Sequence, residues 1–142
     1  MMMVRCYLGP SSIEGLGVFC HDDITRGDKV WRFDRMLDLS FPETKLENVE
    51  RHVCDFLEHY SYPDPRRIGY RVLECDEGRF MNHSMYPNLD FSDGVWGIAV
   101  TDIPAGSELT RDYADFQTGE IVMQPPRHRV STALLRSDMV LN

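Results

Sequence analysis

The chain has 142 residues, a mass of 16.5 kDa and a formal charge of −8 at pH 7. A chain of this length supports one hydrophobic core, so we expect a single domain over residues 1–142. The acidic balance argues against direct nucleic-acid binding, because that affinity comes largely from basic side chains that neutralise phosphates. The sequence has neither a run of about 20 apolar residues nor a signal-peptide pattern. We therefore predict an intracellular protein without a membrane partner, cytoplasmic in a bacterium, with a nuclear location left open for a eukaryotic or viral source.

Alternating apolar residues and turn-forming residues predict a β-rich chain with one helix. We expect strands at residues 3–8, 15–20, 29–33, 36–39 and 69–75 and a hairpin of residues 88–91 with 95–101. Asp34 and Arg35 are expected at a bend, and Gly9 and Pro10 at the end of the first strand. Over residues 41–60 apolar side chains recur every three or four positions and Pro42 suits a first helical position, which predicts one amphipathic helix.

Residues 17–30 and 97–109 share a strand, turn, strand pattern. Two such copies predict similar β units on either side of the helix, but they are too few to establish a repeat architecture. Residues 117–142 contain a double-proline break and a weakly helical segment at 129–141. The four cysteines are scattered without a CxxC pair, which predicts free thiols and no metal site.

The most informative stretch is residues 79–88, with the sequence RFMNHSMYPN. Its Asn, His and Ser side chains do not suit a hydrophobic core, since an unpaired buried polar group costs roughly 1 to 3 kcal/mol. They must bind either the chain itself, as a capped turn, or a ligand. Ser84 and Asn88 are expected to brace the turn. A serine-hydrolase role for Ser84 lacks the surrounding GxSxG elbow.

Three pieces in this order, GLG at 15–17, NHSMYPN at 82–88 and AGSELTRDY at 105–113, resemble the SET-domain protein-lysine methyltransferases. The resemblance extends over about residues 4–116, leaving a tail at 117–142. It implies a mostly β, β-rich α+β fold of several small sheets, with a helical insert at about 41–60 and a pseudoknot-like crossing near the C-terminus.

The resemblance further implies an enzyme that transfers a methyl group from S-adenosylmethionine to a lysine amine of a protein. Tyr113 matches the catalytic tyrosine, and its alternative is a core tyrosine with a hydrogen-bonded tip. The residues that match the cofactor-binding positions are Glu14, Gly15, Leu16, Gly17, Phe80, Met81, Asn82 and His83. The candidates for walls of the lysine channel, each of which could instead be plain core, are Phe56, Tyr60, Tyr70 and Phe116.

Two departures from the family pattern stand out. Met85 occupies the position of a zinc-binding cysteine in many nuclear members, so the chain resembles the small zinc-free viral and bacterial SET proteins. The tail or a second subunit would then have to close the lysine channel. Arg111 stands where many members place the Phe or Tyr that tunes how many methyl groups are added. An outward-pointing Arg111 would leave that role to another residue, and we predict no product state.

The acidic charge favours a basic, histone-like protein or peptide as substrate, and a homodimer is compatible with the sequence. Two other hypotheses remain open at this stage. One is a catalytically silent SET-like module that binds cofactor or peptide as an interaction domain. The other is a small β-rich interaction protein whose motifs match by coincidence.

Overall fold

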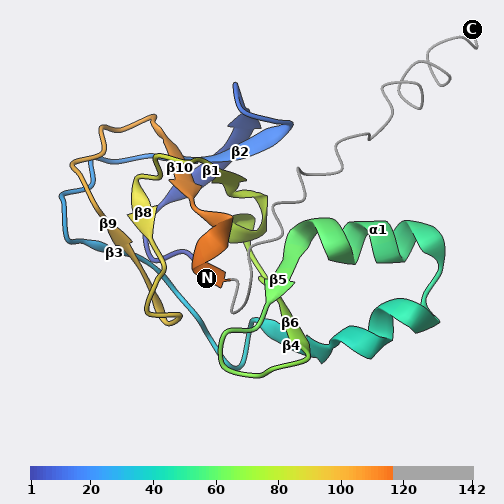
Figure 1. Cartoon of the computed structure of the whole chain (residues 1–142). Coiled ribbons are helices and arrows are strands. Elements are labelled where there is room, and N and C mark those ends of the chain that lie inside the picture. Colours follow the sequence, from blue (N-terminus) through green and yellow to red (C-terminus); the bar gives the residue numbers. More distant parts are fainter. Residues whose placement is uncertain (117–142) are drawn as a thin grey trace, which may run out of the picture.

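The computed structural model describes residues 1–116, which form short strands joined by turns and helical segments (Figure 1). The strands are β1 (Cys6–Pro10), β2 (Leu16–Cys20), β3 (Lys29–Arg32), β4 (Leu39–Pro42), β5 (Ser61–Pro63), β6 (Tyr70–Leu73), β7 (Asn82–His83), β8 (Leu89–Asp90), β9 (Trp96–Ala99) and β10 (Glu108–Arg111). The helical segments are the α-helix α1 (Arg51–Tyr60) and the 3-10 helices η1 (Glu43–Asn48), η2 (Glu77–Phe80) and η3 (Tyr113–Phe116). This strand-rich architecture confirms the predicted mostly β fold.

The strands assemble into three small sheets with the orders β1-β2-β10-β7, β3-β9-β8 and β4-β6-β5. In the first sheet β10 lies between β2, with which it is antiparallel, and β7, with which it is parallel. The register places Thr110 opposite Asn82 and Arg111 opposite His83. β10, the last strand within residues 1–116, therefore brings the segment before Tyr113 alongside the Asn-His pair, as expected for the predicted crossing.

The two similar segments noted in the sequence pair with each other reciprocally. Ile24 and Ile103 each donate a backbone N–H to the other's carbonyl at 2.8 Å. Around them, Gly27 N–H donates to Ala99 and Gly106 N–H donates to Cys20, both at 2.8 Å. The two glycines occupy equivalent turns with φ of 91° and 81°, a region that glycine enters without steric cost. The segments are thus related by a local two-fold arrangement. The sequence indicated that the two segments are similar, but not that they pair with each other.

The exchange extends to the strands. β2, from the first segment, pairs with β10 from the second, and β9, from the second, pairs with β3 from the first. Two side chains complete the symmetry, since Asp102 accepts the Arg26 N–H and Asp23 accepts the Ala105 N–H, each at 2.8 Å. β10 is consequently held in place by contacts with the N-terminal part of the chain.

The prediction of one helix over residues 41–60 was wrong in its first half. Residues 39–42 form β4, in which Pro42 pairs with Tyr70 of β6, and η1 follows. Val49 and Glu50 are extended, with ψ of 160° and 152°, and separate η1 from α1. Pairing in the sheet overrides the helical pattern at Pro42. Figure 1 shows η1 and α1 on the same side of the molecule as the β4-β6-β5 sheet.

Two strand boundaries also differ from expectation. Residues 36–38 form a turn instead of a strand, because the Asp34 carboxylate accepts the N–H groups of Met36 and Leu37 at 2.9 and 3.2 Å. β1 continues through Gly9 and Pro10. A proline is tolerated there because β1 lies at the edge of its sheet. No strand of residues 1–116 lies on the outer side of β1 in this sheet, so the missing N–H of Pro10 costs no hydrogen bond on that side.

The core lies between the sheets and centres on Trp31 and Phe91, whose rings meet edge to face at 5.2 Å. Gly97 is required at this point, because a Cβ there would come within 2.7 Å of the Phe91 ring. The four cysteines carry no disulfide, as predicted. Within residues 1–116 no helix has the length and apolar character needed to cross a bilayer.

Candidate active site

The turn between β1 and β2 is attached to β7 through one side chain. Asn82 Nδ2 lies 3.0 Å from the Glu14 carbonyl and 3.1 Å from the Leu16 carbonyl. Gly15 between them has φ of 47°, and a Cβ at this position would meet nothing within 4 Å. Glycine is therefore needed here for its backbone conformation, and open space lies beside the turn.

Glu108 of β10 is the third acceptor around Asn82, with Oε1 2.9 Å from Nδ2. The same carboxylate accepts the Ser11 hydroxyl, at 2.8 and 2.9 Å from its two oxygens. A Cβ on Gly17 would overlap Oε1. Gly17 has no positive φ, so the second glycine of the GLG motif matters for space: it leaves room for the Glu108 carboxylate in its observed position.

Asn88 ties the 82–88 stretch to β10 at its other end. Its Oδ1 accepts the Thr110 N–H at 2.9 Å, and its Nδ2 donates to the Glu108 carbonyl at 2.8 Å. Ser84 Oγ accepts the Tyr86 N–H at 3.0 Å. Both side chains brace the turn, as predicted.

Tyr113 follows β10 and is fixed against His83. The Tyr113 N–H donates to His83 Nδ1 at 3.1 Å, and the two rings lie 5.0 Å apart. The Nδ1 atom of His83 is thus the acceptor that fixes the backbone of Tyr113. Asp112 Oδ1 lies 3.6 Å from the same nitrogen. Asp112 also accepts the Ala114 N–H at 2.9 Å.

The Tyr113 hydroxyl donates to the Met81 carbonyl at 3.3 Å. Burial raises the pKa of this hydroxyl, and the carboxylates of Glu14 and Glu74 add to the effect while Arg111 opposes it. The hydroxyl is therefore protonated at neutral pH and keeps lone pairs that can accept a hydrogen bond. Met81 itself is a core residue, 1% exposed, so its contribution to the site is its backbone carbonyl.

Arg111 points into the protein, contrary to the outward orientation considered from the sequence. Arg111 as a whole is 4% exposed, and its Nη1 lies 2.9 Å from Oε1 of the fully buried Glu74. Burial opposes the charge of the guanidinium, but Glu74 outweighs it and the pKa of Arg111 is raised overall. Tyr62 and Tyr113 lie near the guanidinium, with ring centroids 5.1 and 5.8 Å from Cζ. An ion pair thus occupies the position next to Tyr113.

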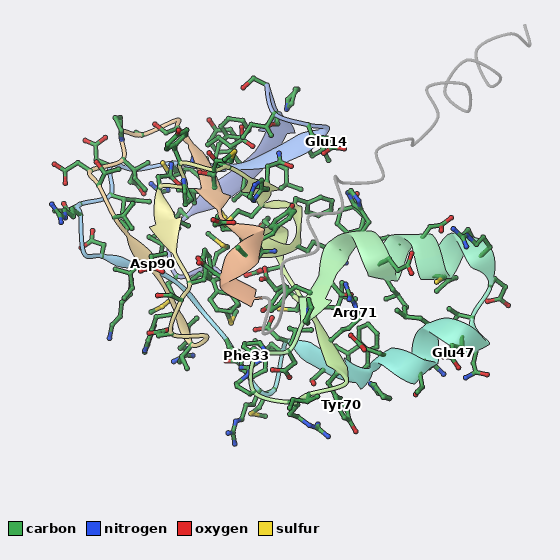
Figure 2. All side chains as sticks on the ribbon, in the orientation of Figure 1. Glu14, Phe33, Glu47, Tyr70, Arg71 and Asp90 are labelled. Atoms are coloured by element: carbon green, nitrogen blue, oxygen red, sulfur yellow. The ribbon has the colours of Figure 1, made fainter. Side chains whose placement is uncertain are left out.

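The channel candidates are only partly brought together. Phe56 packs on Tyr60 and Tyr60 packs on Phe80, with ring centroids 4.8 and 5.2 Å apart, so this aromatic run reaches the residue before Met81. Tyr70 lies elsewhere, beneath Arg67 at 3.6 Å, and Figure 2 shows it well away from Glu14. The Phe116 side chain, like the 117–142 tail, lies outside the described part of the structure.

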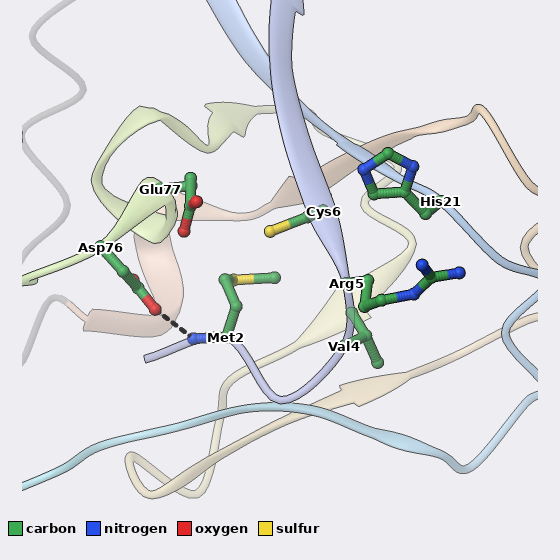
Figure 3. A pocket seen from close by; sticks show the side chains of 7 residues that line it. All are labelled: Met2, Val4, Arg5, Cys6, His21, Asp76 and Glu77. Carbon is green, nitrogen blue, oxygen red and sulfur yellow. Dashed lines mark hydrogen bonds between the residues drawn. The ribbon is translucent and has the colours of Figure 1, made fainter.

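A separate hollow of about 330 Å³ adjoins β1 and the start of η2, and none of its lining residues was predicted for the site (Figure 3). It is lined by Met2, Val4, Arg5, Cys6, His21, Asp76 and Glu77. Burial, with the charges of Glu77 and Asp76, raises the pKa of the Cys6 thiol to about 11. A thiol with that pKa is a poor nucleophile at neutral pH. Residues 1–116 also contain no cluster of three or more His, Cys, Asp or Glu side chains suited to a metal ion.

The structure adds four residues that sequence reasoning missed: Ser11, Tyr62, Glu74 and Glu108. Ser11 and Glu108 are 97 positions apart and Glu74 and Arg111 are 37 apart, so no local pattern links them. The only usable signal was chemical. A buried Arg requires an acidic partner.

Comparisons with known proteins agree with this arrangement. The family model described as the SET domain matches residues 15–114. Among solved structures, the Neurospora histone lysine methyltransferase DIM-5 has a TM-score of 0.54 and 24% identity, over 83% of this chain and 55% of that chain. A Plasmodium falciparum chain described as a candidate histone methyltransferase has a TM-score of 0.54 and 24% identity, over 79% of this chain and 95% of that one.

The apo, autoinhibited Polycomb Repressive Complex 2 of Chaetomium thermophilum has a TM-score of 0.61 and 21% identity, over 95% of this chain. This chain corresponds to only 17% of the length of that chain. At these identities the structural matches show a common fold. The family model covers most of the chain, including the glycine turn, the Asn-His pair and Tyr113, and the protein therefore belongs to the SET-domain family.

Proposed function

We propose that this protein transfers a methyl group from S-adenosylmethionine to the side-chain amine of a lysine in another protein. The observation that carries the proposal is the meeting of three distant segments around β10. These are the turn at Glu14, the pair Asn82 and His83, and Tyr113 with its hydroxyl on the Met81 carbonyl. Membership in a family that contains lysine methyltransferases supports this reading of the geometry.

The groups around the turn fit the amino-acid portion of the cofactor. Asn82 Nδ2 is engaged by the protein, and no described residue donates to its Oδ1. This oxygen can accept from an ammonium group, and the open space beside Gly15 leaves room for a ligand. When bound, S-adenosylmethionine would supply the electrophilic methyl group.

The lysine amine must be neutral to attack a methyl group. With a reference pKa near 10.4, removing its proton at pH 7 costs roughly 4 to 5 kcal/mol. Desolvation beside the half-buried Tyr113 lowers this cost, because burial disfavours the charged amine. The lone pairs of the Tyr113 hydroxyl and the Met81 carbonyl can accept the N–H groups of the amine and direct its own lone pair. The role of Tyr113 is thus orientation by a protonated hydroxyl.

Two observations support a basic protein as substrate. The chain carries a net charge of −8, which favours encounter with a cationic partner. The fold neighbours from Neurospora and Chaetomium are a histone lysine methyltransferase and a Polycomb complex. We therefore place histone-like proteins first among the candidate substrates.

The test is methyl transfer from isotope-labelled S-adenosylmethionine to a panel of histones and other basic proteins, read by mass spectrometry. The wild type should label lysine, and Tyr113→Phe should lose about 100-fold or more in rate while still binding S-adenosylhomocysteine. Tyr7→Phe is the matched control, since Tyr7 is a half-exposed tyrosine of β1 outside the site. Equal rates for wild type and Tyr113→Phe would remove Tyr113 from the mechanism.

A second candidate is a catalytically silent module that binds cofactor or peptide. The observation that favours it is the buried Arg111–Glu74 ion pair beside Tyr113, at the position where the family resemblance implies a Phe or Tyr. Binding of S-adenosylhomocysteine in calorimetry without methyl transfer to any protein of the panel would support this alternative.

A further inference from the structure

Glu108 joins three segments of the site at one carboxylate. From β10 it accepts the hydroxyl of Ser11, in the β1–β2 turn, and the amide of Asn82, in β7. Ser11 Oγ in turn accepts the N–H groups of Ile13 and Glu14 at 2.9 and 3.3 Å. The turn that carries Gly15 is therefore fastened to β10 through Ser11, and to β7 through Asn82.

The acceptors around Asn82 determine which way its amide faces. Nδ2 has two hydrogens and three acceptors within 3.1 Å, namely the carbonyls of Glu14 and Leu16 and the Glu108 carboxylate. An ionised carboxylate only accepts hydrogen bonds, so it would repel Oδ1 if the amide turned over. The amide is thus locked with Nδ2 toward the turn and Oδ1 on the other side.

Gly17, in β2, leaves room for this arrangement. A Cβ on Gly17 would overlap Glu108 Oε1, the oxygen that contacts Asn82. The space beside Gly17 is therefore filled by the Glu108 carboxylate, which comes from a strand more than ninety residues later.

We propose that Glu108 is a positioning residue, which fixes the Asn82 amide with its oxygen toward the ligand's ammonium group and, through Ser11, fixes the adjoining turn. This inference rests on the proposed function, because it takes Asn82 as a contact of the cofactor's amino-acid portion. It goes beyond that function because it gives Glu108 a role in recognising the ligand's ammonium group through Asn82, without direct contact between the Glu108 carboxylate and the ligand.

The inference predicts ligand selectivity that a merely structural role would not produce. Glu108→Gln keeps the shape but adds a donor, which can pair with Asn82 Oδ1 and turn the amide over. Affinity for S-adenosylhomocysteine should fall about tenfold. Affinity for its deaminated analogue, in which hydrogen replaces the α-amino group, should remain within about twofold of wild type. That analogue lacks the ammonium group that would donate a hydrogen bond to Asn82 Oδ1.

The experiment is calorimetry of the full chain with both ligands, supported by circular dichroism and thermal melts of each variant. Glu47→Gln, the same substitution at an exposed position on η1 (Figure 2), is the matched control and should bind like wild type. Ser11→Ala should weaken S-adenosylhomocysteine in the same selective way but less, and it gives a readout if Glu108→Gln folds poorly. Adding Glu108→Gln to Asn82→Ala should cause no further loss.

The outcomes separate the two proposals. Equal binding of S-adenosylhomocysteine by wild type, Glu108→Gln and Ser11→Ala would overturn the positioning role and leave the methyltransferase proposal intact. So would an equal loss of both ligands in the variants, which is the behaviour of a residue that only supports the fold. A wild-type protein that does not bind S-adenosylhomocysteine would overturn the proposed function and the inference that rests on it.

Discussion

Glu74 and Arg111 form an ion pair with Oε1 and Nη1 2.9 Å apart, and both side chains are buried, at 0% and 5% exposed. Gly78 leaves room for the Glu74 carboxylate in its observed position, since a Cβ on residue 78 would overlap Glu74 Oε2. Taking two charges out of water costs several kcal/mol per ion, and the attraction between them seldom returns more than that. Their common position beside Tyr113 points to a role in the site rather than in stability.

This pair leads to a prediction about stability. Arg111→Met should lower the free energy of unfolding by about 3 to 5 kcal/mol, because it leaves Glu74 buried and charged without its guanidinium. Arg111→Met combined with Glu74→Leu should recover most of that loss. Urea denaturation measures both. Arg5→Met is the control, since Arg5 and Asp22 are also 2.9 Å apart but exposed to solvent, and its effect should be much smaller. A double variant as unstable as the single one would contradict the explanation.

The two glycines that face each other across β1 and β2 should respond differently to alanine. Gly17→Ala places a Cβ on the Glu108 carboxylate, whereas Gly9→Ala places one 3.4 Å from the Phe19 ring, an ordinary contact. We expect Gly17→Ala to lower both the melting temperature and the affinity for S-adenosylhomocysteine, and Gly9→Ala to change neither by much. Thermal melts and calorimetry on the two variants provide the comparison, and similar behaviour of both would refute the steric argument.

Alkaline pH should destabilise the fold through its buried tyrosines. Burial raises the pKa of Tyr62 well above 10 in the folded protein, with a further contribution from Glu74. Because the folded pKa exceeds the unfolded one, the stability from protonated Tyr62 is complete below about pH 10 and is lost as the pH rises toward the folded value. Tyr62→Phe should therefore lose less stability than wild type above about pH 10. Urea denaturation across the alkaline range, followed with phenolate absorbance, tests this, and parallel curves would contradict it.

The Cys6 thiol should react slowly with alkylating reagents. Its pKa of about 11 compares with an ordinary value of 9.0, so its thiolate fraction near neutral pH is about 100-fold lower. Mass spectrometry after iodoacetamide treatment should show Cys6 modified about 100-fold more slowly in the native protein than in the same protein unfolded in guanidinium. Comparable rates in the two states would exclude the effect of burial.

The reciprocal hairpins predict equal effects at two distant positions. Asp23→Ala and Asp102→Ala each remove the acceptor of one backbone N–H, and each should lower the free energy of unfolding by about 1 kcal/mol. The two values should agree within about 0.5 kcal/mol, because the bonds are equivalent at 2.8 Å. Chemical denaturation measures both, and a large inequality would show that the symmetry does not extend to energetics.

The features of the candidate site that the sequence indicated are those that depend on local chemistry. Gly15 has the positive φ that a tight turn requires, and the polar run with Asn82 and His83 had no place in a core. The strand-rich class followed from alternating apolar residues. Tyr113 could be singled out only through the family pattern, because a tyrosine after a strand is ordinary in itself.

What could not be predicted depends on partners that are distant in the chain. Pro42 suits a helix start by its own preferences, and only its pairing with Tyr70 makes it part of a strand. Arg111, at the end of β10, gives no indication of its orientation until Glu74 is placed beside it. Glu108 reads as a surface residue of a β-strand until Ser11 and Asn82 converge on it.

The reciprocal pairing of the two similar hairpins also limits how the chain can fold. The Asp102 and Asp23 side chains bond to backbone groups that are 76 and 82 residues away in the sequence. Loops of that length must close before the hairpins can pair. Such non-local topology slows folding. A chain emerging from the ribosome cannot complete β2 until β10 has been synthesised, and β10 is the strand that carries Glu108 and leads to Tyr113. We therefore expect the pairing of β2 with β10 and the placement of Tyr113 to form late in folding.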